Sequence, residues 1–274
     1  MRLRQATPDE LQALALEAHN DDAIGSIQAL ETLAASGPWK VQLSEEGDAI
    51  VFERWREHLD WLSMRAVWAA PSRLPAIVEA SLALALEHGY SCLLSPLIAE
   101  ELSTPYMRAG MQVATRLVVL RRGPTPEDVT APEPPLPPGV VLSEGSLDSL
   151  EEILRLDQRC FEPLWAYDRQ LLGGYLMNDR VVEARDEDAR LVGFTMSSIE
   201  GSQGSLGRLG VDPAMRRRGL AKALVADAAR ALAWQGIGSV TLTTQVENAP
   251  ARALYAACGF DQMRGTLVAL TIEV

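Results

Sequence analysis

The chain has 274 residues and is 47% hydrophobic, enough apolar material for one large or two smaller domains. Its net charge of −12 argues against nucleic acid or an anionic membrane as the main partner. Three scattered cysteines without paired spacing argue against a disulfide framework or a zinc site, and no apolar run is long enough for a membrane helix. We therefore expect a cytoplasmic protein without a metal.

The first half ends in a layout that returns near the end of the chain. Residues 85–112 and 231–262 each read as a helix tail, a glycine, a strand, a tyrosine-bearing helix, and Tyr-x-x-x-Gly followed by an apolar residue. The matching residues are Tyr106 with Tyr255, Gly110 with Gly259, and Met111 with Phe260. This similarity predicts a tandem duplication, with residues 1–122 as the first domain.

A proline-rich stretch separates the halves. Seven prolines lie between Gly123 and Gly139. Proline fixes φ and has no N–H to donate, so this stretch can form neither a helix nor a sheet ladder. It predicts an extended linker at 123–138 and a second domain at 139–274.

The second half alternates strands and helices. Apolar periodicity and turn residues predict strands at 139–145, 180–186, 190–200, 205–211, 239–245 and 266–274, and helices at 146–161, 167–176, 219–234 and 249–258. Ser146 or Ser149 is expected to cap the first of these helices. The pattern indicates an α/β (α+β) fold with a mixed sheet flanked by helices in each domain.

The segment GVDPAMRRRGLAKAL, residues 210–224, concentrates positive charge where a strand leads into a helix. The first N–H groups of a helix have no intrahelical partner and carry the positive end of the helix dipole, so they can bind an anion. Gly219 allows the tight turn, Ala221 leaves space, and Leu220 can anchor the helix. The first half reads AAPSRLPAIVEA at this point and has no such glycine, so we expect its phosphate site to be lost.

Two motifs in the second half resemble the GNAT superfamily of acyl-CoA-dependent N-acyltransferases. Arg216 to Ala221 match the family's Q/R-x-x-G-x-G/A loop. Asn248, Ala251 and Tyr255 match its N-x-x-[AS]-x-x-x-Y element, and Gly259-Phe260 follow. The resemblance covers about residues 139–274, and the first half looks like a degenerate copy of it.

The resemblance implies a site for acetyl-CoA. The backbone of Leu209 and Val211 would pair with the pantetheine amides as an added strand would, and the Val211 N–H would polarise the thioester carbonyl. Asn248 would bind the pantetheine arm and Arg252 the phosphates. The cofactor-binding residues implied in this way are Leu209, Gly210, Val211, Arg216, Arg217, Arg218, Gly219, Leu220, Ala221, Lys222, Asn248, Arg252 and Tyr255.

Tyr255 would donate a proton to the departing thiolate; its alternative is an ordinary half-buried aromatic residue. The attacking amine must lose a proton, and no histidine follows the linker, so Glu200 or Glu162 is a candidate base. Both glutamates also fit plain surface positions.

The segment CFEPLWAYDRQLL, residues 160–172, falls where such proteins shape the acceptor pocket. Phe161 and Trp165 would line that pocket, although core packing explains them equally. Arg208 on the central strand would face it and favour an acceptor with a carboxylate.

The resemblance implies transfer of an acetyl group from acetyl-CoA to a primary amine, carried by a small molecule or a peptide, in a monomer or homodimer. Two alternatives stay open: a non-catalytic acyl-CoA sensor, and a purely structural duplicate that binds no coenzyme A.

Overall fold

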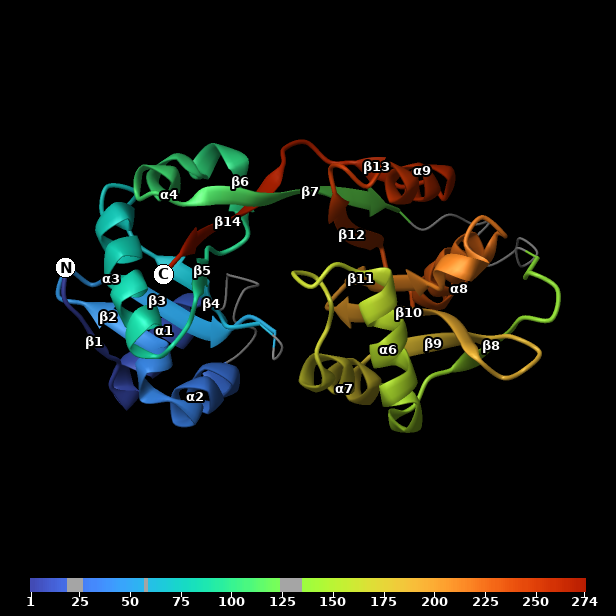
Figure 1. The fold of residues 1–274 in the computed structure, drawn as a ribbon, viewed down its shortest axis with the longest axis horizontal. Coiled ribbons are helices and arrows are strands. Elements are labelled where there is room, and N and C mark those ends of the chain that lie inside the picture. Colours follow the sequence, from blue (N-terminus) through green and yellow to red (C-terminus); the bar gives the residue numbers. More distant parts are fainter. Residues whose placement is uncertain (19–26, 57–58, 124–134) are drawn as a thin grey trace. The chain divides into compact units, whose positions relative to one another are not determined.

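The computed structural model describes residues 1–18, 27–56, 59–123 and 135–274, and Figure 1 shows the chain as a ribbon. Its contacts divide it into two compact units, one of Met1–Arg116 with Gly265–Val274 and one of Leu117–Arg264. Most of the predicted linker, residues 124–134, lies outside the described residues. No helix in the described part combines the length and apolar character needed to cross a membrane.

The first unit is a mixed sheet covered by helices. Its elements are β1 (Leu3–Gln5), α1 (Pro8–Ala18), α2 (Ile27–Ser36), η1 (Pro38–Lys40), β2 (Val41–Ser44), β3 (Ala49–Arg54), β4 (Trp61–Trp68), α3 (Leu74–Glu87), β5 (Cys92–Leu94), β6 (Ile98–Ala99), η2 (Glu100–Leu102), α4 (Thr104–Arg108) and β14 (Leu267–Glu273). The strand order is β1-β2-β3-β4-β5-β14, and β4 runs parallel to β5. One apolar cluster packs α3 and α4 on the sheet, and another packs α1 and α2.

The second unit repeats this plan. Its elements are the second part of β7 (Gln112–Arg122), β8 (Val141–Glu144), η3 (Leu147–Ser149), α6 (Leu150–Cys160), α7 (Arg169–Asn178), β9 (Arg180–Arg185), β10 (Leu191–Glu200), β11 (Gln203–Val211), η4 (Pro213–Met215), α8 (Leu220–Trp234), β12 (Ser239–Gln245), α9 (Ala249–Ala257) and β13 (Asp261–Gln262). The order is β7-β12-β11-β10-β9-β8, and β11 is parallel to β12. Separate apolar clusters pack α6 with α7, and α8 with α9, against the sheet.

The predicted elements of the second half are confirmed, with shifts at two helix starts. The helix expected from residue 146 begins as η3, and neither Ser146 nor Ser149 caps it with its side chain. The next helix begins after Tyr167, because the Asp168 carboxylate accepts the Leu171 N–H at 2.8 Å and so caps the first turn.

Strands are exchanged between the halves of the sequence. Strand β14, the last in the chain, pairs antiparallel with β5 of the first unit. Strand β7 comes before the proline-rich stretch, yet its residues Leu117–Arg122 pair with β12 of the second unit. The contact units therefore begin and end at different residues from the sequence halves.

The duplicated layout has matching hydrogen bonds. After α9, the carbonyl of Tyr255 accepts the N–H groups of Cys258 and Phe260. After α4, the carbonyl of Tyr106 likewise accepts the N–H groups on either side of the matching Gly110, those of Ala109 and Met111. Gly110 and Gly259 both have positive φ, at 94° and 82°. The same helix ending therefore occurs once in each unit.

Candidate functional site

Strands β11 and β12 separate part of the way along the sheet. Their parallel pairing covers Gln203–Ser205 of β11 and ends at the pair of Ser205 with Thr241. Strand β11 continues to Val211, still paired with β10 on its other side, while β12 continues beside β7. One edge of β11 is therefore open from residue 206 to residue 211 within the described part of the chain.

The open edge carries the main-chain groups of the two residues predicted to contact pantetheine. The Asp212 N–H donates to the Val192 carbonyl beside β10. Successive residues of a strand point their N–H groups to opposite edges. The Gly210 N–H therefore also points toward β10, and the N–H groups of Leu209 and Val211 point into the gap. The Val211 carbonyl already accepts the Cys160 thiol at 3.4 Å and Arg216 Nε at 3.3 Å. Of the two residues, Leu209 is therefore the one whose carbonyl and N–H both have no partner among the described residues.

The loop before α8 is an αL turn centred on glycine. Gly219 precedes the helix with φ 90°, and a Cβ there would meet no atom within 4 Å. Arg217 also has a positive φ, at 65°. The first helical hydrogen bond in the loop runs from the Ala223 N–H to the Gly219 carbonyl. No described residue accepts the main-chain N–H groups of residues 216–222, which leaves a row of donors beside an open space.

The side chains of this loop divide into an anchor and an exposed rim. Leu220 is buried and packs with Leu224 in the core, as the sequence predicted. The arginines at 216–218 and Lys222 are exposed. Positive charge therefore surrounds the unpaired N–H groups, an arrangement that suits a diphosphate.

The side chains of Asn248 and Arg252 already make hydrogen bonds to other residues of the chain. Asn248 Oδ1 caps α9 by accepting the Ala251 N–H at 3.2 Å. Arg252 donates from Nη1 to the Val246 carbonyl at 3.1 Å and from Nη2 to Gln262 Oε1 at 3.3 Å. Any contact of Arg252 with a ligand phosphate must therefore share or replace these bonds.

Tyr255 is buried on α9, and its ring packs edge-on against Phe260 with the centroids 5.9 Å apart. Burial raises the pKa of Tyr255 to about 12, although the nearby Arg208 charge opposes this. No described residue hydrogen-bonds its hydroxyl. The hydroxyl is thus protonated at neutral pH and has a free donor, as a general acid requires.

Arg208 lies in a buried cluster with Asp157. Arg208 Nε and Nη2 donate to the two carboxylate oxygens of Asp157, each at 2.7 Å, and Nη2 also donates to the Trp165 carbonyl at 2.8 Å. The guanidinium lies over the rings of Phe161, at 3.4 Å from the centroid, and Tyr167, at 3.9 Å. The structure therefore brings together Arg208, Phe161 and Trp165, but a carboxylate of the chain itself holds the arginine.

Glu200 lies away from this cluster. It ends β10 at the hairpin, opposite Gln203, and its side chain is exposed. Its charge contributes to raising the pKa of Asp179, after burial. Six residues separate Gln203 from Leu209, roughly 20 Å along a strand. Glu162 is exposed as well. The structure thus places Glu200 far from Leu209 along β11, and Glu162 at the surface after α6.

A β-bulge on β11 was not found from the sequence. Met196 pairs with Arg208 and Ser197 with Leu206, so Gly207 is the extra residue. A Cβ on Gly207 would lie 3.3 Å from the Tyr175 hydroxyl. Gly207 sits in a strand-like sequence, and a glycine there is the one signal that could have indicated the bulge.

Gly210 has a packing role that the loop motif did not indicate. A Cβ at Gly210 would come within 2.4 Å of the fully buried Phe194 ring. The absence of a side chain therefore lets β10 and β11 pair closely just before the loop.

The described residues offer no metal site, and the cavity that they form lies away from the open edge of β11. Across residues 1–18, 27–56, 59–123 and 135–274, no group of three or more His, Cys, Asp or Glu side chains is placed to hold a metal ion. A cavity of about 760 Å³ lies in the first unit, where β4 and β5 begin and β14 ends. It contains none of the predicted site residues.

Comparisons with known proteins agree with this geometry. Residues 148–260 match the acetyltransferase (GNAT) family. A mycothiol acetyltransferase of Clavibacter michiganensis is 35% identical over 161 residues, covering 55% of this chain and 52% of that protein. One of Segniliparus rotundus is 34% identical over 145 residues, covering 47% and 54%. The chain thus spans about half the length of the curated relatives it matches.

Solved structures resemble the whole chain. A tandem GNAT protein from the clavulanic acid biosynthesis pathway matches with a TM-score of 0.70 at 14% identity, covering 99% of this chain and 98% of that one. A GCN5-related N-acetyltransferase from Sphaerobacter thermophilus matches with a TM-score of 0.67 at 16% identity, covering 99% and 95%. At such identities the likeness concerns the fold alone. Residues 148–260 of this chain thus match the acetyltransferase (GNAT) family, and the fold of the chain resembles that of tandem GNAT proteins.

Proposed function

We propose that the second unit is an N-acetyltransferase that uses acetyl-CoA and a primary amine. The observation that carries this proposal is the row of unpaired main-chain N–H groups at residues 216–222, next to the open edge of β11. The first fits a diphosphate, and the second fits the extended, amide-bearing pantetheine arm. The name of the curated relatives, mycothiol acetyltransferase, supports acetyl as the transferred group.

In the proposed reaction the amine nitrogen attacks the thioester carbonyl carbon directly. A C–N bond forms, the C–S bond breaks, and coenzyme A leaves as a thiol. The Val211 or Leu209 N–H at the open edge is placed to stabilise the oxyanion. Tyr255 gives its proton to the leaving sulfur. The amine's own proton leaves through water. Glu200 stays the predicted base, and because it lies roughly 20 Å along the strand from Leu209, a chain of several waters must carry the proton to it.

The experiment that tests this function measures thiol release from acetyl-CoA with a panel of primary amines. Tyr255→Phe is expected to lower kcat about 100-fold, the range of a lost general acid, while leaving acetyl-CoA affinity unchanged. The chain supplies a matched control in Tyr106→Phe, since Tyr106 is equally buried and burial likewise raises its pKa to about 12. That variant should retain the wild-type kcat.

Two outcomes would contradict the proposal. Tight acetyl-CoA binding without amine-dependent thiol release would instead identify an acyl-CoA sensor. Failure to bind coenzyme A at all would indicate a structural duplicate.

A further inference from the structure

The cavity of about 760 Å³ in the first unit lies over one face of the sheet, where β4 and β5 begin and β14 ends. Its volume is within the range of small-molecule sites. The opposite face of these strands is filled, because Leu62, Leu93 and Ile272 pack there with α3 and α4. The α1–α2 cluster reaches β4 only at Ala66 and Trp68, toward the end of that strand, and includes no residue of β5 or β14. Helices α1 and α2 therefore leave the cavity face uncovered.

Three side chains stand in a row on this face. Trp61 of β4 pairs with Cys92 of β5, and Cys92 pairs with Glu273 of β14. Residues that pair directly across neighbouring strands point to the same face of a sheet, and the strands lie about 4.8 Å apart. The row thus places an indole ring, a thiol and a carboxylate side by side along the cavity.

The charge in this row favours a cation. Glu273 is the one charged side chain among the described residues that line the cavity, and it forms no ion pair with a described residue. Burial raises the pKa of the Cys92 thiol, a hydrogen bond from the Ile272 main chain opposes this rise, and the Glu273 charge adds to it. The thiol therefore keeps its proton at neutral pH and is a poor nucleophile. A single carboxylate supplies too few ligands for a metal ion and repels anions, which leaves an organic cation.

The remaining groups suit a cation that carries N–H donors. Thr271 lies two residues before Glu273 and so on the same face of β14, and Gln112 lines the cavity from β7. No described residue hydrogen-bonds either side chain, which leaves a hydroxyl oxygen and an amide oxygen as acceptors. The Trp61 ring contacts no described aromatic or cationic side chain, so its face can receive a positive charge. A primary ammonium group has three donors for these acceptors.

We propose that this cavity is a binding site for a small primary ammonium ion, whose charge pairs with Glu273 and lies against the Trp61 ring. The site differs from an acceptor site for acetyl transfer. An attacking amine must be neutral, whereas a neighbouring carboxylate stabilises the charged form of an amine. The first unit thus binds the ion without chemistry, whether or not the second unit transfers acetyl groups.

The test compares three ring compounds of similar size: benzylamine, an ammonium ion at neutral pH, benzyl alcohol, which is neutral, and benzoate, an anion. The full chain is labelled with 5-fluorotryptophan, and Trp61→Phe identifies the fluorine NMR signal of Trp61 among those of the six tryptophans. Benzylamine is expected to shift this signal with a Kd of about 1 mM or lower. Benzyl alcohol should bind about tenfold more weakly, and benzoate should leave the signal unchanged. Equal shifts by benzylamine and benzyl alcohol, or none by benzylamine, overturn the inference.

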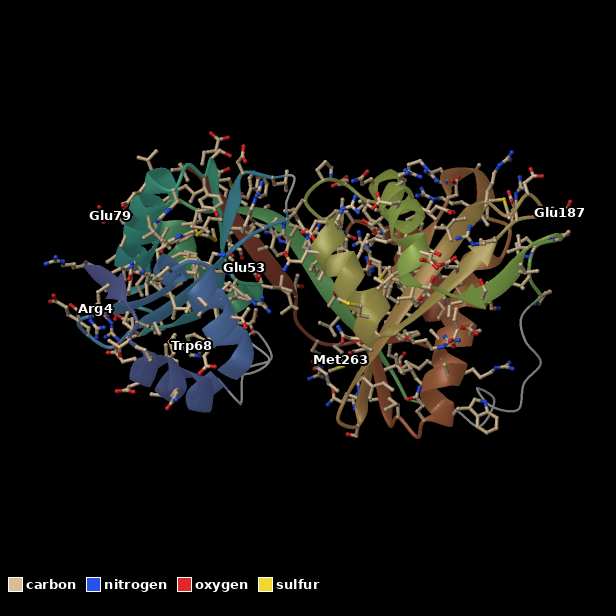
Figure 2. The ribbon with its side chains drawn as sticks, turned by 90° about the horizontal axis from the view of Figure 1, so that it is seen from below. Arg4, Glu53, Trp68, Glu79, Glu187 and Met263 are labelled. Carbon is tan, nitrogen blue, oxygen red and sulfur yellow. The ribbon has the colours of Figure 1, made fainter. Side chains whose placement is uncertain are left out.

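Glu273→Gln tests the carboxylate at constant side-chain size. The affinity for benzylamine should fall about fivefold and that for benzyl alcohol should stay unchanged, because only the ammonium ion pairs with the charge. Glu79→Gln is the matched control, since Glu79 is exposed on α3, which packs on the other face of the sheet, and is labelled in Figure 2. Wild-type affinity for benzylamine in Glu273→Gln overturns the inference, and so does an equal loss in Glu79→Gln.

Salt gives a second measurement of the ion pair on the unmodified chain. Raising the NaCl concentration from about 0.01 M to about 1 M shortens the screening length from about 30 Å to about 3 Å. The affinity for benzylamine should fall over this range, and that for benzyl alcohol should not. A benzylamine affinity that is constant across it would mean that the ring and not the charge is recognised, which overturns the inference.

Discussion

Each unit contains a junction at which a strand leads into a helix, β4 into α3 in the first unit and β11 into α8 in the second. The two junctions differ in the groups that surround their N–H donors. In each, a parallel strand pair covers three residues and then ends. In each, the strand before the junction carries a bulge, at Gly207 in the second unit and at Arg65 in the first. Counted from these bulges, Asp212-Pro213 corresponds to Ala70-Pro71. The junctions therefore derive from one plan.

At the first junction the Asp48 carboxylate accepts hydrogen bonds from neighbouring residues. Asp48 is buried and accepts Arg73 Nη2 at 2.6 Å and Ser44 Oγ at 2.9 Å. The Ala70 N–H also bonds this carboxylate, and together these donors, Arg73 above all, hold the pKa of Asp48 below its usual range against the effect of burial. An internal anion thus accepts the Arg73 side chain and the Ala70 N–H at the first junction. In the second unit the Asp212 N–H, the counterpart of that of Ala70, donates to the Val192 carbonyl, and no described residue accepts the N–H groups of residues 216–222.

The strands that lead to the junctions, β11 and β4, also carry different side chains at equivalent positions. Arg208 of the second unit corresponds to Ala66, and Gly210 corresponds to Trp68, which packs on the α1–α2 cluster and is labelled in Figure 2. The first unit has thus filled with apolar packing the face on which the second keeps Arg208. The two units thus share a backbone pattern at these strands and differ in the side chains that it carries.

The largest expected effect tests whether the second junction binds a diphosphate. Gly219→Glu introduces a strained φ, bulk and a negative charge, and acetyl-CoA affinity should fall at least 100-fold by calorimetry. Gly236→Glu is the matched control, because Gly236 has a φ of 74° and open space around it but follows α8 instead of preceding it. Equal losses in both variants would mean that backbone strain, and not the site, explains the effect.

The second prediction tests whether the first junction is held by its internal anion. Asp48→Asn should lower the free energy of unfolding by about 2–4 kcal/mol, because the Arg73 charge and the Ala70 N–H lose their carboxylate partner. Acetyl-CoA affinity should stay at the wild-type value. A variant that lost coenzyme binding instead would show that the first junction takes part in it.

The same carboxylate predicts a pH dependence with a defined sign. The folded-state pKa of Asp48 is depressed, so its contribution to stability is complete above the unfolded-state pKa of about 3.9 and is lost as the pH falls through the folded-state pKa. Denaturant unfolding from pH 7 to pH 2 should therefore show the wild type and Asp48→Asn converging at the acid end. Parallel curves throughout that range would contradict this assignment.

A smaller effect is expected at the bulge. Gly207→Ala places a Cβ 3.3 Å from the Tyr175 hydroxyl, so the ring must move by a few tenths of an ångström. The KM for the amine should rise roughly threefold, since small misplacements of a site residue lower turnover efficiency measurably. Adding Tyr175→Phe removes the crowded oxygen and should restore most of the loss. If it does not, the bulge acts through some other contact.

The smallest expected effect concerns Tyr255 and alkaline pH. With its pKa raised to about 12, the hydroxyl keeps its proton well beyond neutral pH, so loss of the general acid should not appear below about pH 11. The pH profile of kcat should rise as the amine loses its proton and then stay level to pH 10. A fall between pH 8 and pH 10 would point to a different acid.

Local sequence patterns predicted many of the helices, strands and turns of this protein, because a glycine turn or a helical repeat of apolar residues is contained within a few residues. The strand at 239–245, the helix that begins after Gly219, and the matching turns at Gly110 and Gly259 were all predictable from their own residues. So was the glycine turn before α8, since the motif that predicts it lies within one stretch of chain.

Only the tertiary structure decided the features that join distant residues. Pairing of β14 with β5 and of β7 with β12 depends on strands far apart in the sequence. The Asp157–Arg208 and Asp48–Arg73 pairs join residues 51 and 25 positions apart. No local pattern encodes such partners, because a charged side chain reads the same whether it is solvated or buried against its counterion. The sequence therefore predicted an anion site at the Gly219 loop. The packing decided that the Asp48 carboxylate lies at the first junction, whereas no described residue accepts the N–H groups of residues 216–222 in the second.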